Sequence, residues 1–296
     1  MRNHRRPAPV AALAVALGMA VAFPAPAAAG QEAAADARLA GLLEKAAEYC
    51  RKLEGATLEF SCLEKVEERT FKPPGIKPDT AVNMSGSAGG RMSYAYQSAD
   101  PGFTNETTYE YRFVRRDGAA SEKRVLVDDN GIEKREEDAR PDVLNLRPES
   151  GLFGPVGLLG EARQPHHDYK IVGQERRKGK TYVVVEAVPK PSLGGPPRSA
   201  RVWFQEDDAS VVRIAWYRKT PEGLGQVEAL VAELDVEPDL VTTTEYDVVR
   251  NGLRFPGKDT TEEAYLPKKG KRFVKSRATT VYKDYAFSTV EAGPGR

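Results

Sequence analysis

The sequence predicts a mainly β protein with some helix (α+β), folded as one curved antiparallel sheet or unclosed barrel. Three observations lead to this prediction. About eleven segments alternate like strands, short turns join nearly all of them, and one firm amphipathic helix precedes them. Short turns connect antiparallel neighbours, and a twisted sheet of so many strands curls or closes. The helix and one or two short helices are expected on the concave side.

The N-terminus is organised like a secretory signal peptide. Residues 1–6 carry three arginines, residues 8–23 form an apolar run, and residues 27–29 are small residues suited to cleavage. The apolar run is shorter than the roughly 20 residues of a membrane span. We therefore expect residues 1–29 to be a signal peptide and residues 30–296 to be a single exported domain without a transmembrane span. The expected location is the periplasm of a Gram-negative-type bacterium.

The charge of the chain argues against a nucleic-acid partner. The chain has 44 basic and 43 acidic residues, and residues 1–29 contain three of the basic residues and none of the acidic ones. The exported domain is thus nearly neutral, with a small acidic excess. Nucleic-acid-binding domains instead carry a basic surface.

Residues 39–62 contain both cysteines of the chain. Helical spacing places Cys50 on an apolar stripe that ends before Gly55, and a period of two then places Cys62 on the face of Leu58 and Phe60. Both cysteines are expected to point inward. In an exported protein they are predicted to form a disulfide, which would stabilise the fold by roughly 3 kcal/mol. The alternative is two free buried thiols.

Further segments follow in order. Residues 72–90 are rich in Pro, Gly and Ser and predict a loop, and residues 132–150 predict a loop or an edge strand. Strands are expected near 92–96, 109–113, 125–127, 169–171, 181–188, 201–205, 211–217, 260–266, 271–283 and 286–290. In the segment 211–217, Val212, Ile214 and Trp216 should share one face. Short helices are expected within 152–164 and 222–234.

The strongest local signal is the hairpin around Asn251 and Gly252. This dipeptide between two strand-like runs indicates a two-residue type I′ turn. The turn pairs Val248 with Phe255, so that Tyr246, Val248, Leu253 and Phe255 should share one face.

The leading helix LLEKAAEYCRKLEGA and the hairpins RVWFQEDDASVVRIAWY and TEYDVVRNGLRFPGKDTTEEAY resemble the superfamily of periplasmic lipoprotein carriers, the LolA/LolB-like outer-membrane lipoprotein-sorting proteins. The chain is also similar to a family of exported bacterial proteins of no known activity. Its shared motifs lie at 49–62, 153–159, 251–256 and 282–285. The carrier resemblance implies an unclosed barrel capped by helices, with a hydrophobic cavity for acyl chains and no catalytic residue or metal.

The sequence offers little for catalysis or for a cofactor. His166 and His167 are adjacent, which is poor spacing for metal ligands, and we expect them in a surface loop. No G-x-S-x-G turn is present. Acidic pairs such as Glu67-Glu68 and Glu262-Glu263 are interpreted as solvated faces, although a carboxyl pair for glycoside hydrolysis remains an alternative. We predict no catalytic residue, no metal and no cofactor.

A set of apolar and aromatic side chains is the candidate lining of a ligand cavity, with ordinary core packing as the alternative. The set is Leu43, Phe60, Tyr94, Tyr96, Tyr111, Phe113, Trp216, Tyr246 and Phe255. The function expected from it is a non-enzymatic carrier of a hydrophobic ligand, such as lipid or lipoprotein acyl chains. The alternative is a protein-interaction or sensing module of the cell envelope with a filled core, whose partner is an envelope lipoprotein or outer-membrane protein.

Overall fold

The computed structural model describes residues 27–71, 104–139, 151–177, 179–191, 198–222 and 224–291. Most of the predicted signal peptide, the predicted loop at 72–90 and the predicted strand around Tyr94 and Tyr96 lie outside these residues. In the described residues the chain is mainly β, as predicted, with 13 strands.

The helices are α1 (Ala27–Glu54), α2 (Gly154–Leu159) and α3 (Gly225–Leu234), with short 3-10 turns η2 (Gly151–Phe153) and η3 (Gln164–His166). The strands are β1 (Thr57–Thr70), β2 (Thr104–Arg116), β3 (Ala119–Asp129), β4 (Ile132–Glu137), β5 (His167–Arg177), β6 (Lys180–Pro189), β7 (Arg198–Gln205), β8 (Val211–Arg218), β9 (Val236–Glu245), β10 (Val248–Arg250), β11 (Leu253–Phe255), β12 (Lys258–Pro267) and β13 (Phe273–Glu291).

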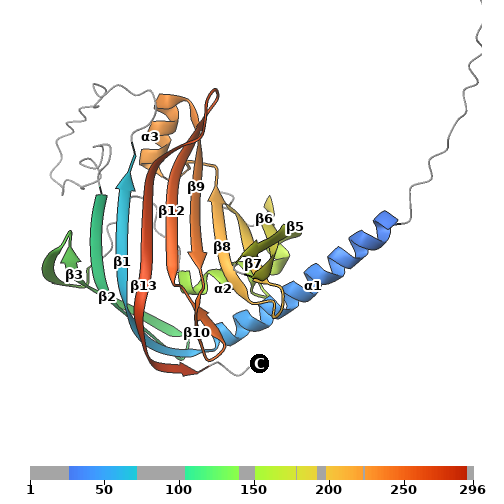
Figure 1. Ribbon diagram of the computed structural model, residues 1–296, viewed down its shortest axis with the longest axis horizontal. Helices are drawn as coiled ribbons and strands as arrows, with labels where there is room; N and C mark the ends of the chain where they lie inside the picture. The colour runs from blue at the N-terminus through green and yellow to red at the C-terminus, as the bar shows by residue number, and fades with distance from the viewer. Residues whose placement is uncertain are drawn as a thin grey trace, which may run out of the picture.

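Eleven strands form one antiparallel sheet in the order β4-β3-β2-β1-β13-β12-β9-β8-β7-β6-β5. The order is a meander broken twice: β1 pairs with the last strand, β13, along most of its length, and β12 pairs with β9 because β10 and β11 form a sheet of their own. The sheet is strongly curved, and β1, β2 and β13 bend sharply at one end (Figure 1). β4 and β5 remain at opposite edges, so the sheet does not close. This arrangement confirms the predicted unclosed antiparallel architecture.

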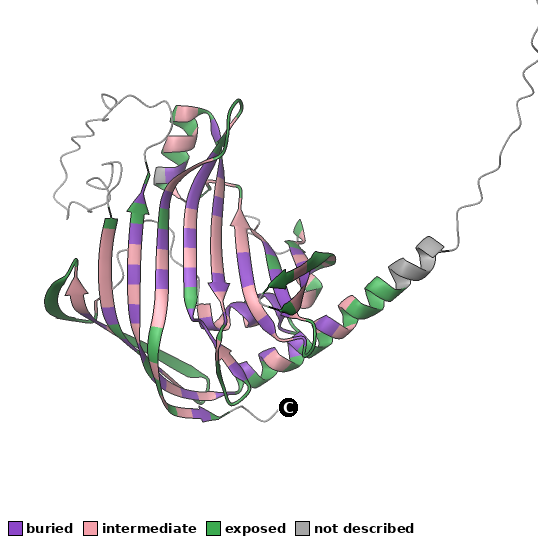
Figure 2. Cartoon of the chain, viewed as in Figure 1, coloured by how far each residue is buried: buried purple, intermediate pink, exposed green. Residues whose placement is uncertain are grey.

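The two faces of the sheet differ in composition. Burial alternates residue by residue along β1, as the stripes in Figure 2 show, and along β12 as far as Glu263. We call the face that packs against α1 and α2 the inner face and the opposite one the outer face. On the outer face, charged side chains pair across strands, as Glu59 does with Arg112 and Arg116.

Four apolar clusters lie on the inner face, and the smallest consists of Val66, Tyr109 and Leu126. The β6–β8 cluster packs α1 and α2 on the middle strands, and its members include Leu42, Ala46, Cys50, Leu158, Leu159, Val183, Val185, Val202, Phe204, Ile214 and Tyr246. The β1–β2 cluster contains Leu53, Leu58, Phe60, Cys62, Tyr111, Phe113, Leu253 and Phe255, among others. The α3 cluster joins Val227 to Val236, Leu240 and Tyr265 at the far end of the sheet.

α1 supplies its apolar stripe as predicted, but only its C-terminal half is packed. Leu42, Ala46, Cys50 and Leu53 are buried, whereas residues 34–38 are exposed and the helix extends beyond the sheet (Figure 1). The helix ends at Glu54, directly before Gly55, where the sequence predicted its end. α1 therefore covers one part of the inner face and leaves the rest to other elements.

The hairpin at Asn251 and Gly252 confirms the predicted register. β10 and β11 pair Val248 with Phe255 and Arg250 with Leu253, and both turn residues have positive φ, +49° and +74°. A two-residue type I′ turn requires this conformation at both positions. The hairpin forms a separate two-stranded sheet, and it buries Leu253 and Phe255 in the β1–β2 cluster.

Two local predictions are wrong. The segments 271–283 and 286–290 form the single strand β13 with bulges. Val212 does not share the face of Ile214 and Trp216, because a register shift between Trp203 and Phe204 turns Val211 inward in its place. Val212 packs instead in an apolar group on the outer face.

Candidate functional site

Five of the seven predicted lining residues that the structure describes are core residues. Phe60, Tyr111, Phe113 and Phe255 lie in the β1–β2 cluster, and Tyr246 lies in the β6–β8 cluster, all less than a tenth exposed. Leu43 and Trp216 are partly buried at the edge of the β6–β8 cluster. Tyr94 and Tyr96 fall outside the described residues.

The aromatic rings of the β1–β2 cluster fill the space between the hairpin and the sheet. The ring of Phe60 stacks on Phe113 at a centroid distance of 5.3 Å and meets the ring of Phe255 edge-on at 5.4 Å. Such contacts are typical of a packed core. Of the predicted set, Leu43 and Trp216 are the residues that remain partly accessible.

The predicted disulfide is absent. Cys50 and Cys62 are both free and buried, and they belong to different clusters: Cys50 packs with α2 and the middle strands, and Cys62 packs with β2 and the hairpin. Both side chains point inward as predicted, but α1 crosses the sheet, so pointing inward does not bring them together. Burial raises the pKa of each thiol to about 12, which keeps both protonated.

The two histidines do not form a metal site. His166 ends η3 and His167 begins β5, where it is buried and its Nδ1 lies 3.2 Å from the carbonyl oxygen of Arg163. The expectation of a surface loop is therefore wrong for His167. Across the described residues, no group of three or more His, Cys, Asp or Glu side chains could hold a metal ion.

A polar strip crosses the inner face between the apolar clusters. All but one of the buried polar or charged residues in the described part of the chain lie in it, the exception being His167. The strip spans β1, β13, β12 and β9 and consists of Glu64, Glu68, Thr70, Ser276, Thr280, Asp259, Thr261, Glu263 and Thr244. Acidic and hydroxyl side chains thus occupy inward positions that apolar residues usually fill.

The strip meets an apolar cluster on three sides. Along β1, Glu64 follows Cys62 of the β1–β2 cluster at the next inward position. Across the strands, Thr244 pairs with Ile214 of the β6–β8 cluster, and Glu263 pairs with Leu240 of the α3 cluster. The inner face is therefore amphipathic, with a polar middle and apolar surroundings.

Asp259 lies where the strip meets the η2 turn. It is 2% exposed, its Oδ2 accepts a 2.9 Å hydrogen bond from the Tyr282 hydroxyl, and its Oδ1 has no hydrogen-bond partner. Burial raises the pKa of Asp259 to about 6; the hydroxyls of Thr244 and Tyr282 oppose this shift, and the nearby charge of Glu64 adds to it. A buried acceptor without a donor is uncommon in folded proteins.

Glu64 has a basic side chain as its ion-pair partner, whereas Asp259 has none among the described residues. Arg124 on β3 donates a 2.6 Å hydrogen bond to Glu64 Oε2 and also stacks over the Tyr111 ring. Burial still raises the pKa of Glu64, because the attraction of Arg124 opposes this effect only in part. Of these two buried carboxyl groups, Glu64 is therefore the one that Arg124 pairs with.

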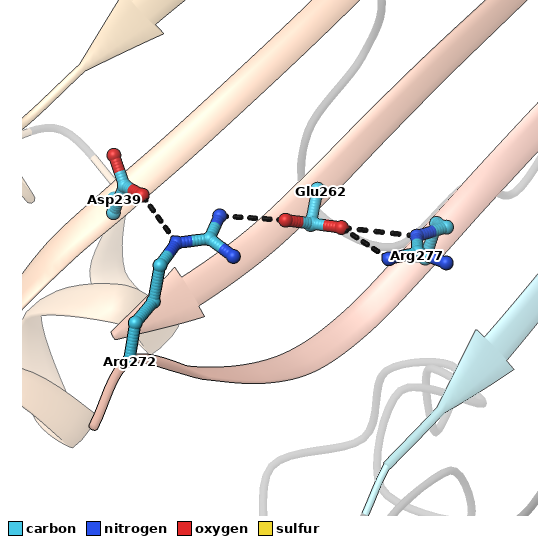
Figure 3. A network of polar contacts seen from close by, with 4 residues as sticks. All are labelled: Asp239, Glu262, Arg272 and Arg277. Carbon is cyan, nitrogen blue, oxygen red and sulfur yellow. Dashed lines mark hydrogen bonds and ion pairs between the residues drawn. The ribbon is translucent and has the colours of Figure 1, made fainter. Parts of the chain in front are cut away.

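On the outer face, the acidic side chain of Glu262 is paired with arginines. Glu262, next to Glu263 in the sequence, accepts hydrogen bonds from Arg272 and Arg277, and Arg272 also bonds Asp239 (Figure 3). Burial alone would raise the pKa of Glu262, but the two arginines lower it overall. Glu263 on the inner face instead accepts bonds from Tyr265, Ser276 and Lys275.

The η2 turn is fixed directly over Asp259. The Tyr246 hydroxyl donates a 2.6 Å hydrogen bond to the carbonyl oxygen of Gly151. A side chain at Gly151 would place its Cβ 3.1 Å from Asp259 Oδ2 and 3.5 Å from Oδ1. The residue that faces the carboxyl group therefore has no side chain of its own.

The sequence prediction missed the strip, although a signal for it was present. Glu64 and Glu68 have the same parity along β1 as Leu58, Phe60 and Cys62, which we predicted to point inward. In each predicted acidic pair of β1 and β12, one member is on the outer face and the other is buried. The interpretation as solvated faces is therefore wrong for Glu68 and Glu263.

No protein-family model matches the sequence, and no curated protein does either. None of the described helices is long and apolar enough to cross a membrane.

Three solved structures are similar to the chain in arrangement. A DUF1329 family protein from Desulfovibrio piger has 11% identity and a TM-score of 0.38, covering 84% of this chain and 92% of its own. A LolA superfamily protein from Nitrosomonas europaea has 13% identity and a TM-score of 0.32, covering 85% and 94%. A putative outer membrane lipoprotein-sorting protein domain from Vibrio parahaemolyticus has 11% identity and a TM-score of 0.36, covering 83% and 92%.

Two of these structures carry the names of the lipoprotein-sorting class that the sequence resembles.

Proposed function

We propose that this protein is an exported, non-enzymatic binding protein that carries an amphiphilic ligand, such as a lipid or the acyl chains of a lipoprotein, on the inner face of its sheet. One observation carries the proposal. A polar strip with an unpartnered carboxylate oxygen lies beside apolar clusters on one continuous face. An amphiphile matches this arrangement, because its head needs polar partners and its chain needs apolar contacts.

We expect the polar head and the apolar chain of the ligand to join near Trp216. It is partly buried at the edge of the β6–β8 cluster, and across the strands it pairs with Thr242. The Thr242 hydroxyl in turn lies 3.3 Å from that of Thr261 in the strip. An indole ring suits such a boundary, because it is largely apolar and has one polar N–H group.

The acids of the strip support binding better than hydrolysis. Glu64 and Asp259 are 4% and 2% exposed, and the η2 turn lies over Asp259. A glycoside hydrolase needs its two carboxyl groups on either side of a substrate bond, with room for water. Holding a compact polar head group requires less space, because the head needs to approach one carboxyl group only.

A second candidate function is a protein-interaction module of the cell envelope. The tight packing of Phe60, Phe113 and Phe255 favours it, because a filled core needs no ligand. This candidate predicts a stable protein partner and no bound lipid.

The test is native mass spectrometry of residues 30–296 after purification from the cell envelope without detergent, followed by uptake of a fluorescent fatty acid. We expect a lipid adduct and saturable uptake of the probe. A bare protein mass together with no uptake would contradict the carrier proposal and favour the interaction module.

Two variants of one strand locate the site. Trp216→Ala on the inner face should weaken uptake by about tenfold, the effect of losing a buried aromatic contact of a little over 1 kcal/mol. Tyr217→Ala, which alters the next residue on the outer face, should leave uptake unchanged. Equal losses in both variants would argue against binding at the inner face.

A further inference from the structure

The polar strip carries more negative charge around Asp259 than its neighbours neutralise. The charged and titratable groups that act on the Asp259 carboxyl are Glu64 from β1, Tyr282 and Tyr285 from β13, and Tyr246 from the segment after β9. In the described part of the chain none of these groups is basic. The nearest acid, Glu64, already has Arg124 as its partner.

The hydrogen bonds of Asp259 are incomplete as well. Tyr282 donates a bond to Oδ2 and the Thr244 hydroxyl also hydrogen-bonds the carboxyl group, but among the described residues Oδ1 has no partner, although the side chain is almost fully buried. An ionised carboxylate accepts several hydrogen bonds, and leaving it short of donors in a buried position is costly. A missing donor with positive charge would satisfy both the charge and the hydrogen bonds.

The surroundings of Asp259 favour a compact donor. Its cross-strand neighbours on the two sides are Thr244 and Thr280, whose hydroxyls can accept hydrogen bonds, and Gly151 above it lies so close that an added Cβ would be 3.1 Å from Oδ2. An ammonium group carries three donors on one small charged centre. A metal ion fits less well, because no suitable ligand group of three exists among the described residues.

We propose that the strip binds an ammonium group at Asp259, so that this protein prefers amphiphiles with a primary amine head over neutral or anionic ones of the same chain length. The inference rests on the proposed carrier function and adds the chemical class of the head group. The amine donates hydrogen bonds to Asp259 Oδ1 and to the flanking threonine hydroxyls, while the alkyl chain contacts the neighbouring apolar cluster.

The experiment compares dodecylamine, dodecanol and dodecanoate as competitors of a bound fluorescent alkyl probe. Purified residues 30–296 are used, below the aggregation concentrations of the competitors and near neutral pH. We expect dodecylamine to displace the probe at about tenfold lower concentration than dodecanol, as one charge-assisted hydrogen bond allows, with dodecanoate the weakest.

Asp259→Asn should remove most of the preference for dodecylamine over dodecanol. The matched control is Asp168→Asn, which makes the same substitution at an exposed position of β5 and should behave like the wild type. A preference for the amine that persists in Asp259→Asn would overturn the inference.

The wild-type protein gives a second test if Asp259→Asn does not fold. Acidification to about pH 4.5 leaves the amine protonated, because alkyl ammonium groups resemble lysine in pKa, but it protonates a carboxyl group of raised pKa. The advantage of dodecylamine over dodecanol should then shrink severalfold, and an advantage that does not change would overturn the inference.

The outcomes separate the two proposals. Binding of all three competitors without preference would overturn the amine inference alone. Failure of all three competitors, and of the probe itself, would overturn the carrier function and the inference with it.

Discussion

Tyr282 connects two buried carboxyl groups across the centre of the sheet. Its hydroxyl donates a 2.9 Å hydrogen bond to Asp259 Oδ2 on β12, and its backbone is opposite Glu64 on β1. β13 thus carries the polar link between the first strand and the later half of the chain. The carboxyl group at one end of the link has an arginine, and the one at the other end has no basic partner among the described residues.

Because Asp259 is buried without a basic partner among the described residues, we expect the stability of the protein to depend on pH in an unusual way. Asp259 titrates at about pH 6 in the folded protein, against about 3.9 when unfolded, so folding favours its protonated form. The free energy of unfolding of the ligand-free protein should therefore fall as pH rises from about 4 to about 6, by roughly 3 kcal/mol from this group, and then level off. Urea unfolding at several pH values measures this.

Asp259→Asn is the matching variant. A neutral amide does not ionise, so the decline of stability between about pH 4 and 6 should flatten, and near neutral pH the variant should be at least as stable as the wild type. Asp168→Asn should retain the wild-type profile, because its side chain is exposed. An unchanged pH profile in Asp259→Asn would show that this carboxyl group is not the one that titrates.

The close approach of α2 to Tyr246 predicts opposite effects at two glycines. A Cβ at Gly154 would lie 2.6 Å from the hydroxyl of the fully buried Tyr246, whereas a Cβ at Gly157 meets nothing within 4 Å. Gly154→Ala should destabilise the protein by about 1–3 kcal/mol through overpacking. Gly157→Ala should stabilise it slightly, by up to about 1 kcal/mol, through helix propensity. Thermal unfolding of both variants measures the difference, and equal melting temperatures would contradict the packing described.

The aromatic cluster predicts a large loss of stability when the hairpin loses its anchor. Phe255 is fully buried and contacts the rings of Phe60 and Phe287. Phe255→Ala should cost about 3–5 kcal/mol, whereas Val249→Ala, at an exposed position of the same hairpin, should cost less than about 0.5 kcal/mol. A mild effect of Phe255→Ala would mean that this ring lines an open cavity.

The cysteines predict a simple thiol count. Cys50 and Cys62 are free, buried and protonated, so the native protein should not react with a thiol reagent such as Ellman's reagent. After denaturation without a reductant, two thiols per chain should react. No reactive thiol in the denatured protein would instead support the disulfide that the export signal led us to expect.

Much of the fold follows from local patterns. The register of β10 and β11 could be predicted from Asn251 and Gly252, because the turn type fixes which residues are paired. The outward position of Val212 could not be predicted, because the bulge at Val212 arises from the pairing of β8 with β7. The pairing of β1 with β13 also depends on contacts between the two ends of the chain.

The candidate site could be predicted less well from the sequence than the fold. The alternation in β1 places Glu64 and Glu68 on the inward positions, but the acidic pair Glu67-Glu68 was interpreted as a solvated face, because buried acids are uncommon. The arginine that pairs with Glu64, Arg124, lies on β3, sixty residues later in the chain. The aromatic residues were correctly expected inside, but a sequence pattern does not distinguish a packed core from a cavity lining.

The most direct test of the account is a carbon-13 NMR titration of the Asp259 carboxyl group, with and without dodecylamine. We predict an apparent pKa of about 6 in the free protein. With saturating dodecylamine the pKa should fall well below this value, because a bound ammonium favours the ionised carboxylate. A titration that dodecylamine leaves unchanged would contradict the claim that the polar strip is the ligand site.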